Sequence, residues 1–261
     1  MTSRQKSILG AIVREYTETA KPVGSRVLVE KYGFKLSPAT IRNEMKALEK
    51  AGLIDQPHTS AGRVPTTNGY RFFVDTLMSY VDLAKRDQVK LENKLKSIRE
   101  GYDAILKESA SMLAQISGSI ALTEKEQRQA FCSGIANLLN QPEFATVEKA
   151  CKMAEVFERL SDEVASLDKK KSSSSSKRDV AVYIGSETRL TSDLDCSLLV
   201  SRYELPSGEE GHVAILGPTR MKYSRNISLI KHLTNLLRNN FFTGILLVTI
   251  LGGSSVCLLK W

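Results

Sequence analysis

Apolar residues near the start of the chain recur at helical spacing, in runs that are separated by breaks. The first run begins behind Thr2 and Gln5, whose hydroxyl and amide fit a capping box, and it stops before Pro22. A second, shorter helix fits residues 25–32, with Gly33 as the residue that closes it. The pattern therefore predicts two helices before residue 34.

A third helix is predicted over residues 38–51. Ser37 suits the N-cap, Pro38 suits the first helical position and Gly52 suits the position after the end. The apolar stripe of this helix, at i, i+4 and i+7, consists of Ile41, Met45 and Leu48. Its opposite side carries small, polar and cationic residues: Ala39, Thr40, Arg42, Asn43, Lys46 and Lys50.

The polar side of this third helix has the chemistry of a DNA-recognition helix. Asn pairs with adenine through two hydrogen bonds, methyl groups of Ala and Thr contact thymine, and Lys or Arg reaches phosphate or guanine. Small side chains lie near the N-terminal end, where a recognition helix approaches base edges, and cations lie further along. An ordinary surface helix with a solvated face explains the same residues, so this helix alone favours neither interpretation.

The segment that follows favours DNA binding. Residues 53–56 predict a short strand, and residues 58–65 predict a tight turn into a second strand, which completes the order of a winged helix. Arg63, beside Gly62, is expected at the tip of this hairpin, where it reaches a phosphate or the minor groove, unless it is only a solvated arginine. The predicted DNA-binding residues are Ser37, Ala39, Thr40, Arg42, Asn43, Lys46, Lys50, His58, Thr59, Ser60 and Arg63.

Composition and charge agree with an anionic partner. The 261 residues suggest two domains, and a hydrophobic share of 42% excludes a wholly disordered chain. Lys and Arg number 37 against 29 Asp and Glu, so the net charge is +8. Residues 1–75 hold 12 of these cations and 7 of the anions, and so +5 of the charge. This balance favours nucleic acid or a membrane surface without choosing between them.

Residues 81–119 predict one long helix. Its apolar residues alternate by four and three in a heptad seam that only Ser109 interrupts: Leu91, Leu95, Ile98, Tyr102, Ile105, Met112 and Ile116. For a single molecule we expect this seam to pack on the chain's own sheet. The regular spacing keeps dimerisation through the same helix open as the alternative.

The rest of the chain alternates helix and strand signals. Residues 131–168 predict helix, and residues 169–178, rich in Lys and Ser, predict a solvated cationic loop. Apolar runs bounded by turn residues predict strands over 180–184, 198–200 and 213–216, and an apolar stripe predicts a helix over 222–238.

The last segment, residues 241–259, contains no charged residue and is long enough for a transmembrane candidate. Its glycines and serines also fit a β-hairpin with arms at 245–251 and 256–259, and a reading-frame accident is a third explanation. A membrane anchor therefore stays open as one of three explanations for this segment.

Residues that carry enzyme or metal chemistry are sparse. Cys132, Cys151, Cys196 and Cys257 lie far apart without a CxxC pair, which predicts reduced, partly buried thiols. The three histidines have no ligand spacing, and no GxSxG, P-loop or HExxH motif occurs. We therefore expect no metal, no cofactor and no enzyme activity.

Several ordered blocks of the sequence resemble the HrcA family of bacterial heat-inducible transcription repressors. Three blocks belong to the predicted winged helix and one continues from it: residues 21–25, 36–45, 56–66 and 69–75. The block at 138–144 resembles a middle motif, and those at 195–197 and 217–225 resemble C-terminal motifs. These matches are spread over most of residues 1–240.

The resemblance implies a homodimer that binds an inverted-repeat DNA operator, called CIRCE, and represses chaperone operons until heat stress releases it. It implies an α+β fold, with a winged helix over 1–78, a GAF-like dimerisation domain over 79–240 and an unassigned tail over 241–261. It also implies that the chaperonin modulates the repressor, and that the protein works at the nucleoid in the bacterial cytoplasm. A two-fold dimer on an inverted repeat is consistent with the general geometry of such readers.

One stretch departs from the family. Between residues 120–123 and 134–136 the family carries several strands and most of an inserted dimerising domain, where this chain has about ten residues. We therefore expect a reduced GAF-like sheet and an altered dimer contact. Two alternatives stay open: a regulator that responds to a membrane or a ligand through its C-terminal part, and a basic winged helix that binds nucleic acid without sequence preference.

Overall fold

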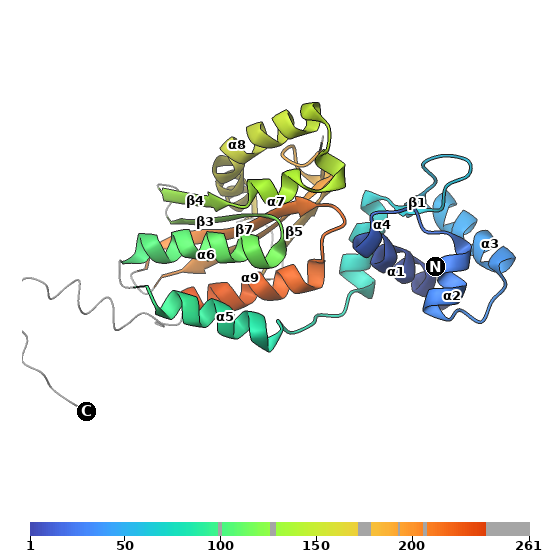
Figure 1. Cartoon of the computed structure of the whole chain (residues 1–261), viewed down its shortest axis with the longest axis horizontal. Helices are drawn as coiled ribbons and strands as arrows, with labels where there is room; N and C mark the ends of the chain where they lie inside the picture. The colour runs from blue at the N-terminus through green and yellow to red at the C-terminus, as the bar shows by residue number, and fades with distance from the viewer. Residues whose placement is uncertain (99–100, 126–128, 172–178, 193, 206–207, 239–261) are drawn as a thin grey trace, which may run out of the picture.

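The computed structural model describes residues 1–98, 101–125, 129–171, 179–192, 194–205 and 208–238. Figure 1 shows a small helical domain at one end of the molecule and a layered domain of sheet and helices at the other. A linker over residues 78–84 joins them. The fold is α+β, as the sequence predicts.

The N-terminal domain is a winged helix. Its capping box is present as predicted, because Thr2 Oγ1 accepts a hydrogen bond from Gln5 N at 3.2 Å and Gln5 Oε1 accepts one from Thr2 N at 3.0 Å. The predicted helices are confirmed, and a further short helix with a π-helical turn follows the hairpin. In chain order the elements are α1 (Ser3–Thr19), α2 (Ser25–Tyr32), α3 (Pro38–Lys50), β1 (Ile54–Asp55), β2 (Val64–Pro65), α4 (Thr67–Phe72) and η1 (Phe73–Leu77).

The C-terminal domain is built on a five-stranded antiparallel sheet in the order β4-β3-β7-β6-β5. The three predicted strands are confirmed as β7, β6 and β5, which lie next to one another in this sheet. The strands are β3 (Ile120–Lys125), β4 (Gln129–Ser133), β5 (Ala181–Ile184), β6 (Cys196–Glu204) and β7 (Glu210–Pro218).

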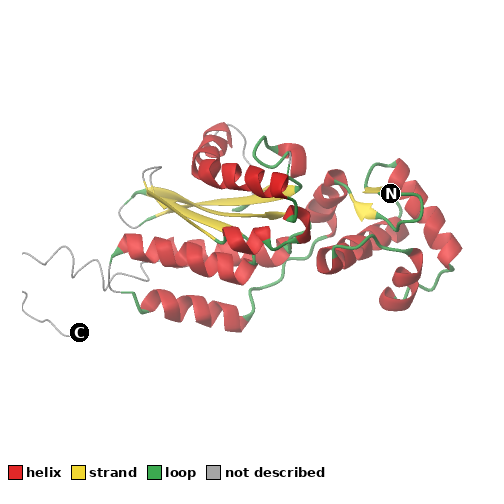
Figure 2. Cartoon of the chain, turned by 45° about the horizontal axis from the view of Figure 1, so that its top comes forward, coloured by secondary structure: helices red, strands yellow, loops and turns green. Residues whose placement is uncertain are grey.

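Helices cover both faces of this sheet. Figure 1 shows α7 and α8 on one face and α6 and α9 on the other, with α5 outside α6 and α9, and Figure 2 shows the same layers in another view. The helices are α5 (Lys85–Lys96), α6 (Tyr102–Ser117), α7 (Ile135–Leu139), α8 (Val147–Lys171) and α9 (Tyr223–Arg238), with 3-10 turns η2 (Pro142–Phe144) and η3 (Gly185–Glu187). Successive side chains of a strand point to opposite faces of the sheet, so the strands contribute apolar residues to the core on each face.

The predicted long helix over 81–119 is wrong in its middle. The segment forms two helices: α5 ends at Lys96 and α6 begins at Tyr102. Ser97 caps α5 by donating from its Oγ to the carbonyl oxygen of Lys94 at 2.7 Å. Gly101 precedes α6 with φ 95°, a conformation that a helix cannot contain and that glycine adopts without strain.

The heptad seam is therefore not a surface for pairing with a second copy. Leu91, Leu95 and Ile105 are each 0% exposed, and they pack in one core with residues of α9. The expectation that the seam packs on the chain's own sheet domain is confirmed, and dimerisation through this seam is wrong. The physical reason is that α5 folds back beside α6 instead of continuing it.

Several other boundaries differ from the prediction. Residues 81–84 belong to the linker and not to a helix, and the predicted helical stretch 131–168 is interrupted at residues 140–141 and 145–146 between α7, η2 and α8. Residues 131–133, predicted as helix, are the end of β4, because Phe131 and Cys132 pair with β3 across the sheet. Helix α8 runs to Lys171, so it extends into the predicted cationic loop, while residues 172–178 lie outside the described residues. Strand β3 had no prediction, because only its first three residues, 120–122, form an apolar run, directly after a helical pattern.

The two domains share one apolar core and several polar contacts. Tyr70 of α4 lies against Tyr223 of α9, with ring centroids 6.0 Å apart. Arg71 forms an ion pair with Glu187 and donates to the carbonyl oxygen of Val182 at 2.7 Å. These contacts join α4 to the edge of the sheet at β5.

Arg220 adds a second tether between the domains. Its guanidinium pairs with Glu143, donates to Gln141 Oε1 at 2.7 Å and reaches the carbonyl oxygen of Thr17 in α1 at 3.4 Å. The local sequence places Arg220 only in the turn between β7 and α9. The structure shows instead that it holds three segments together at the domain junction.

Candidate nucleic-acid interface

Helix α3 presents the face that the sequence predicts for DNA recognition. Ser37 is its N-cap and accepts from Thr40 N at 3.1 Å, with Pro38 in the first turn. The stripe of Ile41, Met45 and Leu48 is buried against α1 and α2. The burial of this stripe turns the opposite side outward, where Ala39, Arg42, Asn43, Lys46 and Lys50 are exposed.

Some polar side chains on this face already form hydrogen bonds within the protein, and others do not. Among the residues that the structure describes, Asn43, Lys46 and Lys50 have no hydrogen bond or ion pair with another side chain. Arg42 Nε donates to Ser25 Oγ at 3.3 Å, which links α3 to the start of α2. Asn43, Lys46 and Lys50 are therefore free to bind a ligand outside the protein.

Two of the predicted contact residues are already engaged at the helix start. Ser37 Oγ and Thr40 Oγ1 lie 2.9 Å apart, and the Ser37 hydroxyl also caps the helix. Their first role is to fix the end of α3. A phosphate that approaches this end would meet the N–H groups of the first turn as well as these hydroxyls.

The wing is a short hairpin whose tip carries exposed polar groups. A turn over residues 58–61 is closed by the Ala61 N–H, which donates to the His58 carbonyl oxygen at 2.8 Å. Gln56 supports this turn from beneath, because its amide donates to the carbonyl oxygens of Thr59 at 2.8 Å and Ala61 at 3.0 Å. His58, Thr59 and Ser60 are exposed at the tip, in reach of a partner.

Arg63 is not at the tip of the wing, so its predicted position is wrong. It lies at the base, where its backbone forms a bridge with Val23 through hydrogen bonds of 2.8 and 2.9 Å. Its side chain is 13% exposed and donates to Glu49 Oε2 from Nη2 at 2.9 Å and from Nε at 3.2 Å. Arg63 therefore joins the wing to α3 and to the loop before α2.

Gly62 makes this close approach of the wing base possible. A Cβ atom at residue 62 would lie 2.4 Å from the carbonyl carbon of Val23, which is far inside van der Waals contact. Any larger residue would push the wing away from the loop before α2. Gln56 and Glu49 are functional supports that sequence reasoning missed, because their partners are backbone atoms and a residue that the folded hairpin brings near.

Within the described ranges, one buried cluster of the C-terminal domain contains side chains of the kinds that catalyse reactions in enzymes: a histidine, a glutamate and a serine. His212 Nδ1 lies 2.7 Å from Glu124 Oε1, and Ser161 Oγ donates to Glu124 Oε2 at 2.6 Å. Glu124 is 0% exposed, so no substrate reaches this group. Its effect is to connect β3, β7 and α8.

The described cysteines do not form a reactive pair. Burial raises the pKa of the Cys132 thiol to about 11 and holds that of Cys196 far above its ordinary value. Both therefore stay protonated at neutral pH. Cys151 is exposed on α8, so the expectation of partial burial holds for two of the three cysteines described.

A three-helix bundle with a β-hairpin, an exposed face with free amide and ammonium groups, and a second domain tethered behind it define a winged-helix DNA-binding regulator. Two family models locate the chain within this class. The winged helix-turn-helix transcription repressor model, HrcA DNA-binding, matches residues 1–78, and the HrcA protein C-terminal domain matches residues 73–227. The chain belongs to the HrcA family of heat-inducible transcription repressors.

Individual relatives agree with this assignment. The heat-inducible transcription repressor HrcA of Desulfitobacterium hafniense is 28% identical, with 91% of this chain and 96% of the relative covered. That alignment extends over 341 positions, more than the 261 residues of this chain, so the relative contains stretches that this chain lacks. HrcA of Synechococcus elongatus is 49% identical over 123 residues, which is 47% of this chain and 35% of the relative.

A solved structure shares the fold. The crystal structure of a hypothetical protein at 2.2 Å resolution superimposes with a TM-score of 0.70 at 20% identity, covering 94% of this chain and 99% of that chain. Within the described ranges, none of the helices combines the length and apolar character needed to cross a bilayer. The apolar segment 241–259, for which an anchor or a hairpin was considered, lies outside those ranges.

Proposed function

We propose that this chain represses chaperone operons by binding a CIRCE-type inverted repeat in double-stranded DNA as a homodimer, with α3 of each copy in a major groove. The observation that carries the proposal is the exposed face of α3, on which Asn43, Lys46 and Lys50 have no partner among the described residues. An amide at the centre and two cations further along match a base edge and the flanking phosphates.

The roles of the contact residues follow from their positions. Asn43 reads a base, most simply adenine, because its side chain carries both a donor and an acceptor. Lys46 and Lys50 neutralise phosphates, and Arg42 does so while it keeps its bond to Ser25. At the wing, His58, Thr59 and Ser60 approach the backbone, whereas Arg63 acts by holding the wing in place.

The replacement Asn43→Ala tests base reading. We expect a loss of about 1–3 kcal/mol on the specific operator and little loss on random DNA at the same salt concentration. Asn93→Ala on α5 is the matched control, because Asn93 is also exposed and lies in the other domain. Equal losses on both DNAs would show that Asn43 does not read bases.

A dimer is required by the proposed operator, since one winged helix contacts only one half-site. The seam on α5 and α6 is buried within one copy, so we propose that the two copies meet through another surface. Sedimentation of the full chain at micromolar concentration tests this point. We expect a dimer, and a monomer that still binds one complete operator tightly would contradict the dimeric mechanism.

Heat release and chaperonin control complete the proposed function. A repressor acts where its operator lies, so we place this chain in the bacterial cytoplasm with the nucleoid. We expect purified chaperonin to increase the fraction of chain that binds operator after mild heating. Operator binding measured before and after a heat pulse, with and without chaperonin, tests both points, and recovery that is identical in the two samples would contradict chaperonin control.

A further inference from the structure

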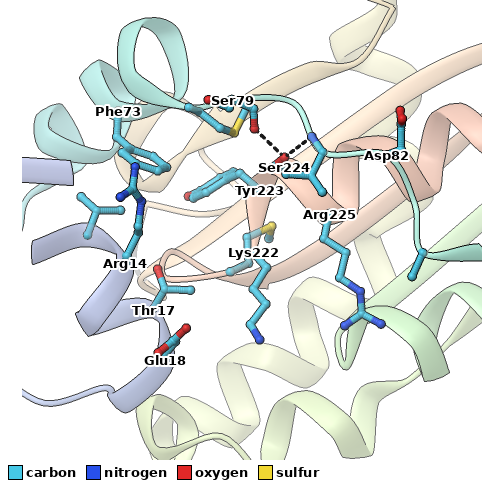
Figure 3. Close-up of a pocket in the computed structure, with 15 residues that line it drawn as sticks. Arg14, Thr17, Glu18, Phe73, Ser79, Asp82, Lys222, Tyr223, Ser224 and Arg225 are labelled. Atoms are coloured by element: carbon cyan, nitrogen blue, oxygen red, sulfur yellow. Dashed lines mark hydrogen bonds between the residues drawn. The ribbon is translucent and has the colours of Figure 1, made fainter. Parts of the chain in front are cut away.

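A cavity between the two domains is not used by the proposed DNA contacts. It has a volume of about 470 Å³ and lies where α1, the linker and the start of α9 meet (Figure 3). Small-molecule sites have volumes of roughly 300–1,000 Å³ and occur preferentially between domains. The size and the place of this cavity therefore fit a ligand of low molecular weight.

The walls of the cavity are mostly apolar. The apolar lining residues are Val13 from α1, Phe73 from η1, Met78 from the linker, and Met221 and Tyr223 from the C-terminal domain. Met221 and Tyr223 are buried, at 6% and 3% exposure, so they form a firm base. An apolar ligand body would lose its contact with water against these five side chains.

The wall formed by the linker is held in place before any ligand binds. Ser224 Oγ donates to the carbonyl oxygen of Ser79 at 2.8 Å and accepts from the Val81 N–H at 2.9 Å, as Figure 3 shows. Ser228 Oγ donates to the Val81 carbonyl oxygen at 2.5 Å. Because the linker is fixed to α9 in this way, the cavity is largely preformed and a ligand does not have to order it.

Charge at the cavity favours an anion. Arg14 of α1 and Lys222 before α9 are exposed on opposite walls, and neither has a hydrogen bond or ion pair within the described part of the chain. Arg225 extends to the same side as Lys222 in Figure 3 and is paired with Asp87 at 2.9 Å. The first turn of α9 belongs to this wall, and the start of a helix carries a partial positive charge.

Two acidic residues, Glu18 and Asp82, also line the cavity. Glu18 lies 3.5 Å from the ammonium group of Lys31, which pairs more closely with Glu15 at 2.6 Å, so Glu18 keeps part of its negative charge. Asp82 points away from Lys222 in Figure 3. Arg14 and Lys222, which have no ion pair among the described residues, therefore remain available to an acidic group of a ligand.

We propose that this cavity binds a small amphipathic organic anion, with its apolar body between Phe73, Met78 and Tyr223 and its acidic group at Lys222, opposite Arg14. Such a ligand would contact the DNA-binding domain, the linker and the C-terminal domain at once. It would therefore stabilise the arrangement of the two domains that the structure shows. This inference concerns a site apart from α3, and it does not depend on operator binding.

Calorimetric titration of the full chain with decanoate tests the proposal, with decylammonium as the cationic counterpart of the same chain length. We expect saturable binding of one decanoate per chain at or below about 1 mM and binding of decylammonium at least about tenfold weaker. Equal binding of the two probes would overturn the role of charge. No saturable binding of decanoate would also overturn the proposal, including the case in which the chain's own apolar residues 241–259 occupy the cavity.

Variants locate the site. Lys222→Met and Arg14→Met should each weaken decanoate binding about tenfold, whereas Lys107→Met, an exposed lysine on α6, should leave it unchanged. Ala84→Trp should block the cavity, because Ala84 is a lining residue, and Ala145→Trp is its exposed control elsewhere. Circular dichroism confirms folding of each variant. Decanoate binding that survives Ala84→Trp undiminished would show that the probe binds elsewhere and would refute the site.

Discussion

Replacing Arg63 by alanine separates a residue that supports the wing from one that contacts DNA. In the folded protein the Arg63 guanidinium donates from two nitrogens to Glu49 Oε2, at 2.9 and 3.2 Å. The Arg63 side chain is 13% exposed and that of Glu49 is 32% exposed. The replacement therefore removes a partly buried ion pair that links the base of the wing to α3, together with the packing of the arginine stem.

The expected cost follows from this partial burial. A hydrogen bond that involves a charged group contributes about 1.5–3 kcal/mol, whereas a fully exposed ion pair contributes about 0–1 kcal/mol. Glu49 keeps access to water after the replacement, so it does not become a buried unpaired charge. We expect Arg63→Ala to lower the free energy of unfolding by about 1–2 kcal/mol, with a coupling to Glu49→Ala of about 1 kcal/mol in a double-mutant cycle.

Urea unfolding of the four proteins in this cycle measures the coupling, and operator binding at several salt concentrations measures the contact with phosphate. We expect Lys46→Ala to lower the salt slope by about one unit, because it removes one neutralised phosphate, and Arg63→Ala to leave the slope unchanged. A slope that falls by about one unit in Arg63→Ala, with unchanged stability and no coupling to Glu49, would refute the supporting role.

Three further predictions concern the packing and ionisation of the two domains. Gly69→Ala should destabilise the winged helix by about 2 kcal/mol in thermal unfolding, because its Cβ would lie 2.0 Å from the carbonyl oxygen of Leu53, and an unchanged melting temperature would contradict this close contact. The hydrogen bond from Lys31 holds the pKa of Glu15 in the folded protein below its ordinary value of about 4. The stability that this ionised carboxylate adds is therefore fully present above the unfolded pKa, and it is lost as the pH falls through the lower folded pKa. The stability gap between wild type and Glu15→Gln should therefore close in acid, and a gap that widens there would contradict the sign. Leu95→Asp should abolish cooperative unfolding while Val89→Asp on the exposed side of α5 does not, and a folded but monomeric Leu95→Asp protein would restore the seam as a dimer contact.

The sequence by itself determined the local structure of the winged helix. The capping box at Thr2, the N-cap at Ser37 and the glycines at positions 33 and 52 act within a few residues of where they stand, so their effect is readable without tertiary information. The buried and exposed sides of α3 were readable for the same reason, since a period of 3.6 residues separates them. The face that carries Asn43 and Lys46 was thus available before the fold was known.

Positions that depend on partners far along the chain were decided only by the tertiary structure. Arg63 looked like a residue of the hairpin tip, but pairing of its backbone with Val23 and of its side chain with Glu49 places it at the base. The heptad spacing from residue 91 to 116 is compatible with one long helix and with two shorter ones. The structure has two helices, because the backbone turns at Gly101.

The domain junction shows the same limit. The motif at 138–144 and the motif at 217–225 are far apart in the chain, and only the fold brings Glu143 to Arg220 and Arg220 to α1. The interdomain cavity likewise arises only in the folded protein, because its walls come from three separate segments. Spacing along a chain reports which side of one element faces inward, whereas a contact between elements depends on how they pack, and no local pattern encodes that choice.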